Sequence, residues 1–436
     1  MAVPDTTSWS SRRCGDPLAT VAVCATLGLL VTACSGGAKS AARHGGHASV
    51  GTAAAAVRLS ITPSSGSTDP APNRGITVTA AGGRISRVIV RTGGDPVTGT
   101  LNVAGTVWHS TWALDVSQHY AVVATAVAVS GKPVTQTSSF RTVSPRQTFR
   151  ARIIEGSRQT YGVGTPIILF FSRPIVDKAA VERSLEVSAS KPVMGAWYWD
   201  GSCRLAPMCL YFRTRGYWPT HTRVSFTGHL NGVEVAPGVY GHHTLTQTFT
   251  IGSSLSVVAN TAGHYMNVYR GGRLFAHWPI SSGRPGDDTP NGTYLTIEKE
   301  NPVDMIGPGY NIEVPWSVRF TFSGDYLHDA YWSVGEQGFT NVSHGCVNMS
   351  PADAEIYYKM AVPGDPVKII GSPRAGTWDN GWTVWFLPWK QWLRGSALHE
   401  AVQVGPDGST FVSRASPLAT PAAAPIRAPN AQRRSA

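Results

Sequence analysis

The sequence predicts a mainly β protein, with two immunoglobulin-like β-sandwiches followed by a third β-rich domain that contains a short helix. Glycine and proline, which mark turns, account for 46 and 30 of the 436 residues. Charged residues make up 14% of the chain, against about 25% in an average globular protein, which disfavours helical bundles. Short alternating apolar runs separated by turn residues fill most of the chain, and this pattern is typical of antiparallel strands.

The first 33 residues are predicted to be a lipoprotein signal peptide. Arg12 and Arg13 precede an apolar run over residues 18–31, which is too short for an ordinary membrane span. The run leads into Val-Thr-Ala-Cys-Ser-Gly-Gly, which resembles a bacterial lipobox and implies cleavage before Cys34 and lipidation of that residue. We therefore expect a mature protein that is lipid-anchored on the extracytoplasmic face of the cell membrane and associated with the cell wall. An ordinary signal-peptidase site and an uncleaved anchor are the alternatives.

Residues 34–56 are rich in glycine, alanine and serine and are predicted to form a flexible tether. Residues 57–145 and 146–252 each alternate short strand-like runs with turns, which predicts one immunoglobulin-like sandwich in each. One short helix is predicted near residues 177–185. The predicted strands cover residues 76–80, 87–91, 108–116, 120–129, 167–171, 196–199, 210–213, 223–228 and 246–251.

The six cysteines divide into groups according to the compartment they would occupy. Cys14 and Cys24 would leave with the signal peptide, and Cys34 would carry lipid. Cys203 and Cys209 are close enough in the chain to pair in an oxidising exterior, so a disulfide is predicted there, with two free thiols as the alternative. The sixth cysteine is left without a partner, which is the usual sign of a reactive thiol.

That cysteine, Cys346, lies in the run Ser-His-Gly-Cys-Val-Asn over residues 343–348, and His328 precedes it by eighteen positions. A thiol becomes a good nucleophile when a neighbouring group accepts its proton, and imidazole is the usual partner. Gly345 allows close approach of a substrate carbonyl, and amides in such a turn donate to an oxyanion. The pattern predicts a cysteine acyl-transfer site. A buried core cysteine and a zinc site formed with His328 and His344 are the alternatives, although no fourth zinc ligand is evident.

The residues around this cysteine resemble the L,D-transpeptidase (YkuD) family. The resemblance lies in His-Asp-Ala-Tyr-Trp-Ser-Val-Gly at residues 328–335, the run at 343–348, Ser-Gly at 282–283 and Thr-Pro-Asn-Gly-Thr-Tyr at 289–294. It covers about residues 253–372 and implies a β-rich YkuD-type catalytic domain there. Two immunoglobulin-like domains ahead of that domain also match the layout of actinobacterial members of the family.

The resemblance implies a peptidoglycan L,D-transpeptidase. His328, oriented by the backbone carbonyl of Asp329, would take the proton of Cys346, and the thiolate would attack a tetrapeptide stem with release of terminal D-alanine. Amides near Gly345 and Cys346 would hold the oxyanion. The acyl group would pass to the side-chain amine of a diaminopimelate-type acceptor, which gives a 3→3 cross-link, and carbapenems would inhibit by acylating the same thiol. No metal or cofactor is needed.

Further residues receive roles from the same resemblance. Ser343 is expected to hydrogen-bond within the cysteine loop, while His344 and Asn348 shape the loop and assist the acceptor. Residues 301–315 are expected to form a lid over the acyl-donor groove, with an ordinary surface hairpin as the alternative. The family often carries serine at the position of Asp329, where the side chain does not act, so this aspartate departs from the pattern; by its charge alone, a carboxylate nearby would raise the basicity of the histidine. The residues expected to contact substrate are Met305, Tyr310, Trp332 and Ser333.

A helix is predicted to follow the cysteine run. It begins after Ser350, a suitable N-cap followed by proline, continues to about Met360, and is ended by Pro363 and Gly364. The nucleophile would then lie on a loop just ahead of a helix. The helix dipole is expected to lower the pKa of the thiol.

Residues 373–395 form a predicted C-terminal Trp-rich subdomain. We expect its aromatic side chains to pack as a strap, and binding of sugar faces is the alternative. Residues 396–436 are rich in alanine, proline and arginine and are predicted to be a disordered tail. The aromatic residues of the subdomain are Trp378, Trp382, Trp385, Phe386, Trp389 and Trp392.

The net charge of +11 favours an anionic partner such as an envelope polymer or a lipid head group, although a merely solvated basic surface explains it equally well. No basic helix or aromatic-basic motif is evident, and an exported protein rarely meets nucleic acid, so nucleic-acid binding is not expected. Two other functions remain open: an L,D-carboxypeptidase or other secreted cysteine acyl hydrolase, and a non-catalytic wall-binding lipoprotein. No papain-like Cys-Gly-Ser-Cys-Trp stretch supports a peptidase that acts on protein.

Overall fold

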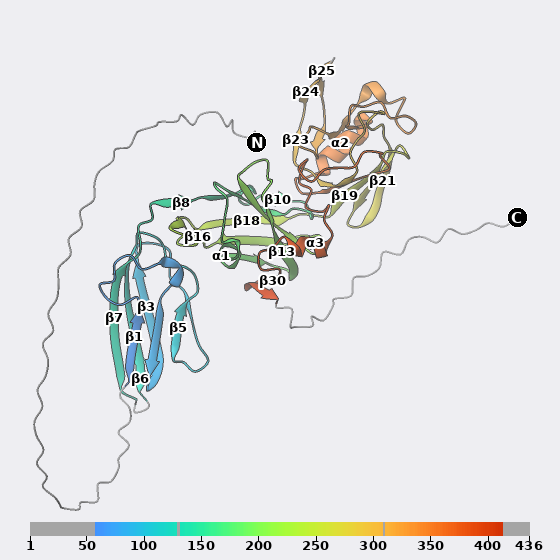
Figure 1. The fold of residues 1–436 in the computed structure, drawn as a ribbon. Helices are drawn as coiled ribbons and strands as arrows, with labels where there is room; N and C mark the ends of the chain where they lie inside the picture. The colour runs from blue at the N-terminus through green and yellow to red at the C-terminus, as the bar shows by residue number, and fades with distance from the viewer. Residues whose placement is uncertain (1–56, 129–130, 308–309, 413–436) are drawn as a thin grey trace, which may run out of the picture. The chain divides into compact units, whose positions relative to one another are not determined.

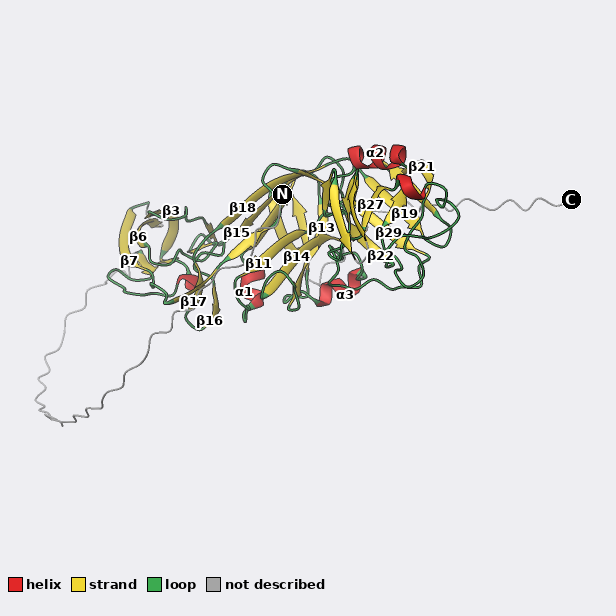
Figure 2. Cartoon of the chain, turned by 90° about the horizontal axis from the view of Figure 1, so that it is seen from above, coloured by secondary structure: helices red, strands yellow, loops and turns green. Residues whose placement is uncertain are grey.

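The computed structural model describes residues 57–128, 131–307 and 310–412. Strands dominate these residues, and the α-helices are α1 (Lys178–Arg183), α2 (Pro351–Met360) and α3 (Trp389–Arg394) (Figure 2). The prediction of a mainly β protein is therefore confirmed. None of the helices in the described ranges is long and apolar enough to cross a membrane. The predicted signal peptide, Cys34 and the predicted tether lie outside the described residues.

The first domain is a sandwich of a four-stranded and a three-stranded sheet (Figure 1). One sheet has the strand order β1-β2-β5-β4 and the other the order β3-β6-β7. Strand β6 alternates buried with partly exposed residues, so Tyr120, Val122 and Ala124 face the core. The strands are β1 (Arg58–Thr62), β2 (Thr77–Ala81), β3 (Gly83–Thr92), β4 (Gly99–Leu101), β5 (Val107–Ser110), β6 (His119–Ala128) and β7 (Pro133–Arg141).

The strand predicted over residues 108–116 is wrong in its length, because β5 ends at Ser110. The Ser110 hydroxyl accepts a hydrogen bond from the Ile76 amide at 3.0 Å. Farther on, the Asp115 amide donates to the Tyr120 hydroxyl at 2.7 Å. These bonds turn the chain toward β6, so it does not extend the sheet.

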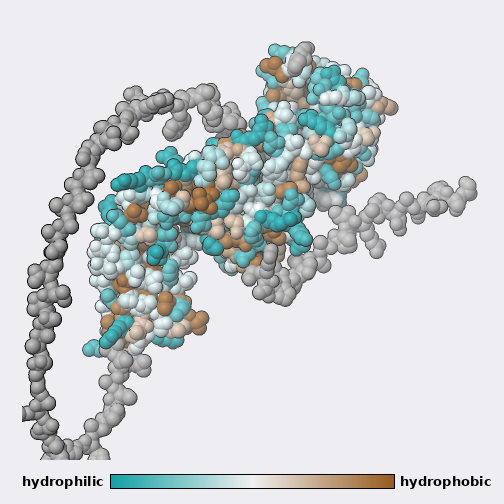
Figure 3. Space-filling model, in the orientation of Figure 1, coloured by the Kyte–Doolittle hydropathy of each residue, from teal (hydrophilic) through white to brown (hydrophobic). Residues whose placement is uncertain are grey.

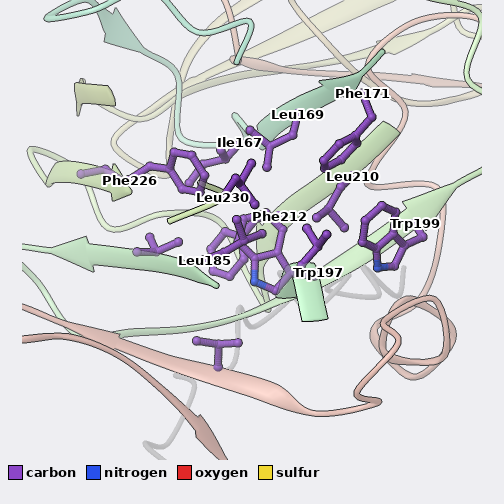
Figure 4. Packing of buried hydrophobic residues seen from close by; sticks show 14 of the residues in the cluster. Ile167, Leu169, Phe171, Leu185, Trp197, Trp199, Leu210, Phe212, Phe226 and Leu230 are labelled. Atoms are coloured by element: carbon purple, nitrogen blue, oxygen red, sulfur yellow. The ribbon is translucent and has the colours of Figure 1, made fainter. Parts of the chain in front are cut away.

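The second domain packs the sheet β10-β18-β15-β12 against the sheet β31-β30-β13-β14-β11-β9, with β16-β17-β8 as a small third sheet. Figure 4 shows the aromatic side chains between the layers, among them Trp197 and Phe212, whose ring centroids are 5.0 Å apart. The predicted helix is confirmed as α1, whose N-cap Asp177 accepts a hydrogen bond from the Ala180 amide at 2.9 Å. The strands are β8 (Gln147–Phe149), β9 (Ala151–Ile153), β10 (Thr160–Tyr161), β11 (Ile167–Phe171), β12 (Leu185–Ala189), β13 (Val193–Asp200), β14 (Met208–Thr214), β15 (Arg223–Gly228), β16 (Glu234–Ala236), β17 (Val239–Gly241) and β18 (Leu245–Ile251).

The prediction that disorder begins at Ser396 is wrong for the residues up to Val412. Strands β30 (Ala401–Gly405) and β31 (Gly408–Val412) form a hairpin, and β30 pairs with β13 in the second domain. The hairpin buries Val402 and Val404 in the core of that domain, which is the physical reason for its order. The rest of the predicted tail lies outside the described residues.

The tryptophan-rich segment packs on the outer face of the β13–β14 pair. The Arg213 guanidinium lies over the rings of Trp385 and Trp392, 4.5 and 4.7 Å from their centroids, and donates to the Leu387 carbonyl at 2.8 Å. The Trp385 indole donates to the Gly164 carbonyl at 2.8 Å. A cation enclosed by aromatic faces and bonded to backbone is a packing arrangement, which agrees with the strap interpretation.

Two further links fasten the second domain. Cys203 and Cys209 form a disulfide, so the predicted pairing is confirmed. The buried carboxylate of Glu182 accepts hydrogen bonds from the Trp199 indole at 2.6 Å and from the Ser396 hydroxyl at 2.7 Å. It also accepts one from the backbone amide after Ser396 at 2.6 Å, so helix α1 holds the start of the C-terminal hairpin.

The third domain contains the sheets β21-β20-β19-β29-β22 and β23-β26-β27-β28 and the hairpin β24–β25. Helix α2 confirms the prediction for this segment, because the hydroxyl of its N-cap Ser350 accepts from the Asp353 amide at 3.2 Å. Tyr357 of α2 is buried in one cluster with Leu327 and Val347, so the helix supports β27 and β28. The strands are β19 (Leu255–Asn260), β20 (Tyr265–Arg270), β21 (Arg273–Pro279), β22 (Gly292–Leu295), β23 (Glu298–Glu300), β24 (Val303–Gly307), β25 (Tyr310–Val314), β26 (Ser317–Arg319), β27 (Tyr326–Asp329), β28 (Val347–Met349) and β29 (Pro366–Ile370).

Most apolar side chains of the described residues gather in four buried clusters, one in each domain and one beneath the tryptophans. On the face of the molecule that Figure 3 shows, apolar residues form small separate patches between hydrophilic ones. Among the large apolar side chains that stay exposed, Tyr331 and Trp332 belong to the 3₁₀ turn that follows β27. That turn follows the strand that carries the predicted base, His328.

Candidate active site

Strands β27 and β28 bring the predicted base and nucleophile together. The strands run parallel, with Leu327 opposite Val347 and His328 opposite Asn348. Cys346 immediately precedes β28, and its sulfur accepts a hydrogen bond from the Tyr326 amide at 3.4 Å. Because side chains alternate along a strand, this register places the His328 and Cys346 side chains on one face of the sheet.

His328 is held in one orientation by backbone. Its Nδ1 atom lies 2.6 Å from the carbonyl oxygen of Asp329, which is the contact predicted for it. Its ring also stacks against that of Trp332 at an interplanar angle of 29°, with the centroids 5.9 Å apart. The histidine is buried, and burial lowers its pKa to about 4, although the bond to the carbonyl acts in the opposite direction.

The carboxylate of Asp329 does not act as predicted. No hydrogen bond or ion pair joins it to the His328 ring, and its Oδ1 atom is buried without a partner among the described residues. Burial also raises the pKa of Asp329. The expectation that this carboxylate makes His328 more basic is therefore wrong, because the group that raises the pKa of His328 is the backbone carbonyl of Asp329 and not its side chain.

The Cys346 thiol is partly exposed and lies between two backbone groups. It accepts from the Tyr326 amide, and its sulfur is 3.7 Å from the carbonyl oxygen of Gly324. Burial raises the pKa of the thiol to about 12, and the nearby Asp325 carboxylate acts in the same direction. The resting pair is therefore a neutral thiol beside a neutral imidazole.

The predicted effect of the helix dipole on this thiol is wrong. Strand β28 lies between Cys346 and the start of α2 at Pro351, so the nucleophile precedes a strand and not a helix. A helix dipole acts mainly within the first turn.

Hydrogen bonds fix the loop that carries the nucleophile. The Ser343 hydroxyl donates to the Cys346 carbonyl at 2.7 Å and accepts from the Gly345 amide at 3.2 Å. The Thr289 hydroxyl donates to the Gly345 carbonyl at 2.7 Å and accepts from the Gly283 amide at 2.9 Å. These bonds explain why the 282–283 and 289–294 segments accompany the cysteine run.

The same bonds distinguish between the two backbone amides, of Gly345 and Cys346, that were expected to donate to the oxyanion. The Gly345 amide is engaged by Ser343, whereas no group in the described part of the chain bonds to the Cys346 amide. Gly345 has φ +132, a backbone conformation that L-residues rarely adopt. A glycine at this position therefore lets the loop present the free Cys346 amide beside the sulfur.

The remaining predicted site residues separate into open and buried ones. His344 is exposed, and its ring lies 4.9 Å from that of Tyr310, which belongs to the hairpin predicted as a lid. Trp332 is 44% exposed beside His328, and Met305 is half-buried on β24. Ser333 is buried and accepts from the Asn348 amide group at 2.9 Å. Ser333 therefore supports Asn348 and does not face a substrate, contrary to the prediction.

Two side chains at this site were missed by sequence reasoning. Thr289 was noted only as part of a recurrent segment, without a role. Asp325 is a buried carboxylate next to the strand that carries the base. The sequence did contain a sign of it: an acidic residue stands directly before the apolar residues at the start of β27, and acidic residues are rarely buried without a functional or structural reason.

The zinc alternative has no geometric support. Within residues 57–412, apart from the undescribed positions 129–130 and 308–309, no group of three His, Cys, Asp or Glu side chains is placed to hold a metal ion. Nδ1 of His328 is occupied by backbone, and His344 stacks on the hairpin. The arrangement fits nucleophilic acyl transfer: a thiol, a base with one ring nitrogen free, and an unengaged amide beside the sulfur.

Comparisons with known proteins agree with this chemistry. Residues 254–369 match the L,D-transpeptidase catalytic domain family (YkuD), and residues 67–234 match a bacterial Ig domain family. The chain is 31% identical to L,D-transpeptidase 2 of Mycobacterium tuberculosis over 335 residues, which is 74% of this chain and 80% of that protein. It is 33% identical to L,D-transpeptidase 5 of the same species, over 79% of this chain and 78% of that protein. A solved L,D-transpeptidase in complex with imipenem is 33% identical, with a TM-score of 0.43, and covers 52% of this chain and 100% of its own.

Proposed function

Because this chain belongs to the L,D-transpeptidase family, we propose that Cys346 forms a thioester with one peptidoglycan stem peptide and passes the acyl group to the amine of another. The product is a 3→3 cross-link. The observation that carries the proposal is the placement of His328 on β27 and of Cys346 immediately before β28, the strand that pairs with β27 in parallel, with Nδ1 of the histidine bound to backbone.

Acylation begins from the neutral pair. His328 takes the thiol proton on its free ring nitrogen as the sulfur attacks the carbonyl of the third stem residue. The Cys346 amide donates to the oxyanion, since the neighbouring Gly345 amide is engaged. The imidazolium then gives its proton to the leaving nitrogen, and terminal D-alanine departs.

The Tyr310–His344 pair marks one boundary of the substrate groove in this proposal. Tyr310 lies on the β24–β25 hairpin and His344 on the nucleophile loop, so their stacking joins the predicted lid to the catalytic loop. The exposed Trp332 stacks against His328, and we expect it to contact an incoming stem peptide in addition to Tyr310 and His344. Met305 supports the hairpin opposite Ile312.

Mass spectrometry of purified tetrapeptide muropeptides incubated with the protein tests the proposal. Wild type is expected to give 3→3 dimers and free D-alanine, and Cys346→Ala to give neither. Tripeptide stems without dimers would instead indicate the carboxypeptidase alternative. Unchanged muropeptides in the presence of bound protein would indicate a non-catalytic wall-binding protein.

Carbapenem sensitivity follows from the same thiol. A carbapenem presents a strained carbonyl to Cys346, and ring opening would leave a thioester on the protein. Hydrolysis of that thioester is slow if the groove is built for an amine acceptor and water competes poorly.

Anchoring through Cys34 completes the proposal. The residues before Cys34 have the pattern of a lipoprotein signal, and a diacylated cysteine binds membranes stably where one chain binds only marginally. Lipidation would hold the enzyme on the extracytoplasmic face of the membrane, next to its polymeric substrate.

A further inference from the structure

Asp325 places a carboxylate directly beside the nucleophile loop. The residues on either side of it both contact the Cys346 sulfur, Gly324 through its carbonyl oxygen at 3.7 Å and Tyr326 through its amide at 3.4 Å. Its own Oδ1 atom occupies the space that a Cβ atom at position 345 would need. The carboxylate therefore contacts Gly345, the neighbour of Cys346, while both chain neighbours of Asp325 contact the Cys346 sulfur.

The two oxygens of this carboxylate differ in their partners. Oδ2 accepts hydrogen bonds from the Thr321 hydroxyl at 2.6 Å and the Ser323 hydroxyl at 3.0 Å, which hold the side chain in place. Oδ1 accepts none from the described residues, and no Lys, Arg or His of those residues forms an ion pair with Asp325. A chain of net charge +11 thus keeps a carboxylate without a cationic partner at its active site.

A carboxylate in this position does not assist the first half of the reaction. It disfavours the thiolate form of Cys346, so an enzyme that only hydrolysed its thioester would gain nothing from it. Its charge is favourable when a cation arrives, and the amine of an acceptor stem is cationic at neutral pH. In a partly buried site this attraction is stronger than at the surface.

We infer that Asp325 is a specificity-determining residue that favours a cationic amine over water as the acyl acceptor. The inference rests on the proposed transpeptidase function, and it concerns only the fate of the acyl-enzyme. Asp325 acts by attracting the ammonium group to the thioester and by stabilising the positive charge on nitrogen in the tetrahedral adduct.

The transfer step balances without any further reactant. The ammonium group gives one proton to neutral His328, which passes it to solvent, and the nitrogen lone pair then forms the C–N bond. The C–S bond breaks and its electron pair returns to sulfur, which takes the second nitrogen proton and restores the Cys346 thiol. Water attack would follow the same bond changes but gains no attraction from the carboxylate.

The test is the partition of the acyl-enzyme in the full-length protein, measured by mass spectrometry with tetrapeptide donor and a lysine-type amine acceptor. Asp325→Asn is expected to lower the ratio of transfer to hydrolysis about tenfold. With hydroxylamine, which is uncharged at neutral pH, the ratio is expected to change by less than about twofold. Acylation by a carbapenem should stay as fast as in wild type or become faster, because a like charge near the thiol is gone.

Ser323→Ala is the matched control, since it removes one hydrogen bond to Oδ2 and keeps the charge. It is expected to keep the wild-type ratio, because the shorter bond from the Thr321 hydroxyl to Oδ2 remains and holds the carboxylate. A ratio unchanged in Asp325→Asn, or a fall of equal size with hydroxylamine, would overturn the inference while leaving Cys346 acylation intact. Slower acylation in Asp325→Asn would also overturn it, because it would show a structural role. Absence of any acyl-enzyme in wild type would instead contradict the proposed function.

Discussion

Nδ1 of His328 lies 2.6 Å from the backbone carbonyl oxygen of Asp329. A carbonyl oxygen only accepts, so Nδ1 carries the proton in the neutral ring and Nε2 keeps its lone pair. The base is thus set in one tautomer before any substrate binds. The Asp329 side chain takes no part in this contact.

Removal of this base should slow acylation without abolishing it. His328→Ala is expected to reduce the rate of carbapenem adduct formation by about 10²-fold or more, because a neutral thiol with a raised pKa has no proton acceptor left. Intact-protein mass spectrometry over time measures the rate. Equal rates in wild type and His328→Ala would contradict the assignment of His328 as the base but would be compatible with Cys346 as the nucleophile.

The adduct itself should be lost in Cys346→Ala. A single covalent adduct is expected on wild type, because Cys346 is the one cysteine in the described ranges that is outside a disulfide. An adduct that survives the substitution, for instance on Ser343, would contradict the whole catalytic assignment. Ser343 is a poor nucleophile in this geometry because its hydroxyl already donates to the Cys346 carbonyl.

The pH dependence of acylation should reflect the buried imidazole. His328 acts only when neutral, and burial lowers its pKa to about 4, so the rate should hold down to about pH 5 and fall as the pH drops through 4. An ordinary histidine would lose activity below about pH 6.5. Adduct formation measured across this range, with circular dichroism at each pH as the control for folding, distinguishes the two. A midpoint near pH 6.5 would show that the ring is solvated.

Two C-terminal truncations test the contribution of the β30–β31 hairpin to stability. Removal of residues 396–436 deletes β30 and β31 and takes three donors from the buried Glu182 carboxylate. We expect it to destabilise the second domain by about 3 kcal/mol or more, seen as a lower thermal unfolding midpoint. Removal of residues 413–436 deletes none of these contacts and should leave the midpoint unchanged. Equal midpoints for the two truncations would show that the hairpin contributes nothing.

Membrane association should depend on Cys34. Mature wild-type protein is expected to partition into the detergent phase, and Cys34→Ala protein into the aqueous phase, because two acyl chains supply the anchor. Phase separation followed by immunoblotting measures this. Cys34→Ala protein that stays with the membrane would indicate an uncleaved apolar helix in place of lipid.

Local chemistry made several elements predictable. Ser350 followed by proline marks a helix start, and α2 begins there because the serine hydroxyl binds the Asp353 amide. The spacing of Cys203 and Cys209 indicated the disulfide, and the cysteine run with its upstream histidine indicated the site. Such patterns involve residues that are close together in the chain, so they can be recognised without knowledge of the fold.

Other features depend on partners far away in the chain. The hairpin of β30 and β31 has alternation and an Asp407-Gly408 turn, but the composition of the whole tail masked this signal. The raised pKa of Cys346 follows from burial and from Asp325, neither of which spacing along the chain reveals. The buried hydroxyl of Ser333 likewise finds its partner in Asn348, fifteen positions away.

The pairing of β13 with β30 sets an order for folding. Val193 lies opposite Val404, so closing this contact spans 211 positions (404 − 193). A chain that emerges from its N-terminus can form the first domain early, but the edge of the second domain stays unpaired until the third domain has been synthesised. Contacts of such high sequence separation form slowly, and an open strand edge is prone to wrong pairing while it waits. The β30–β31 hairpin, which contains the last residues that the structure describes, therefore completes a domain that begins some 250 residues earlier, and that domain can close only after the residues up to Val412 have been synthesised.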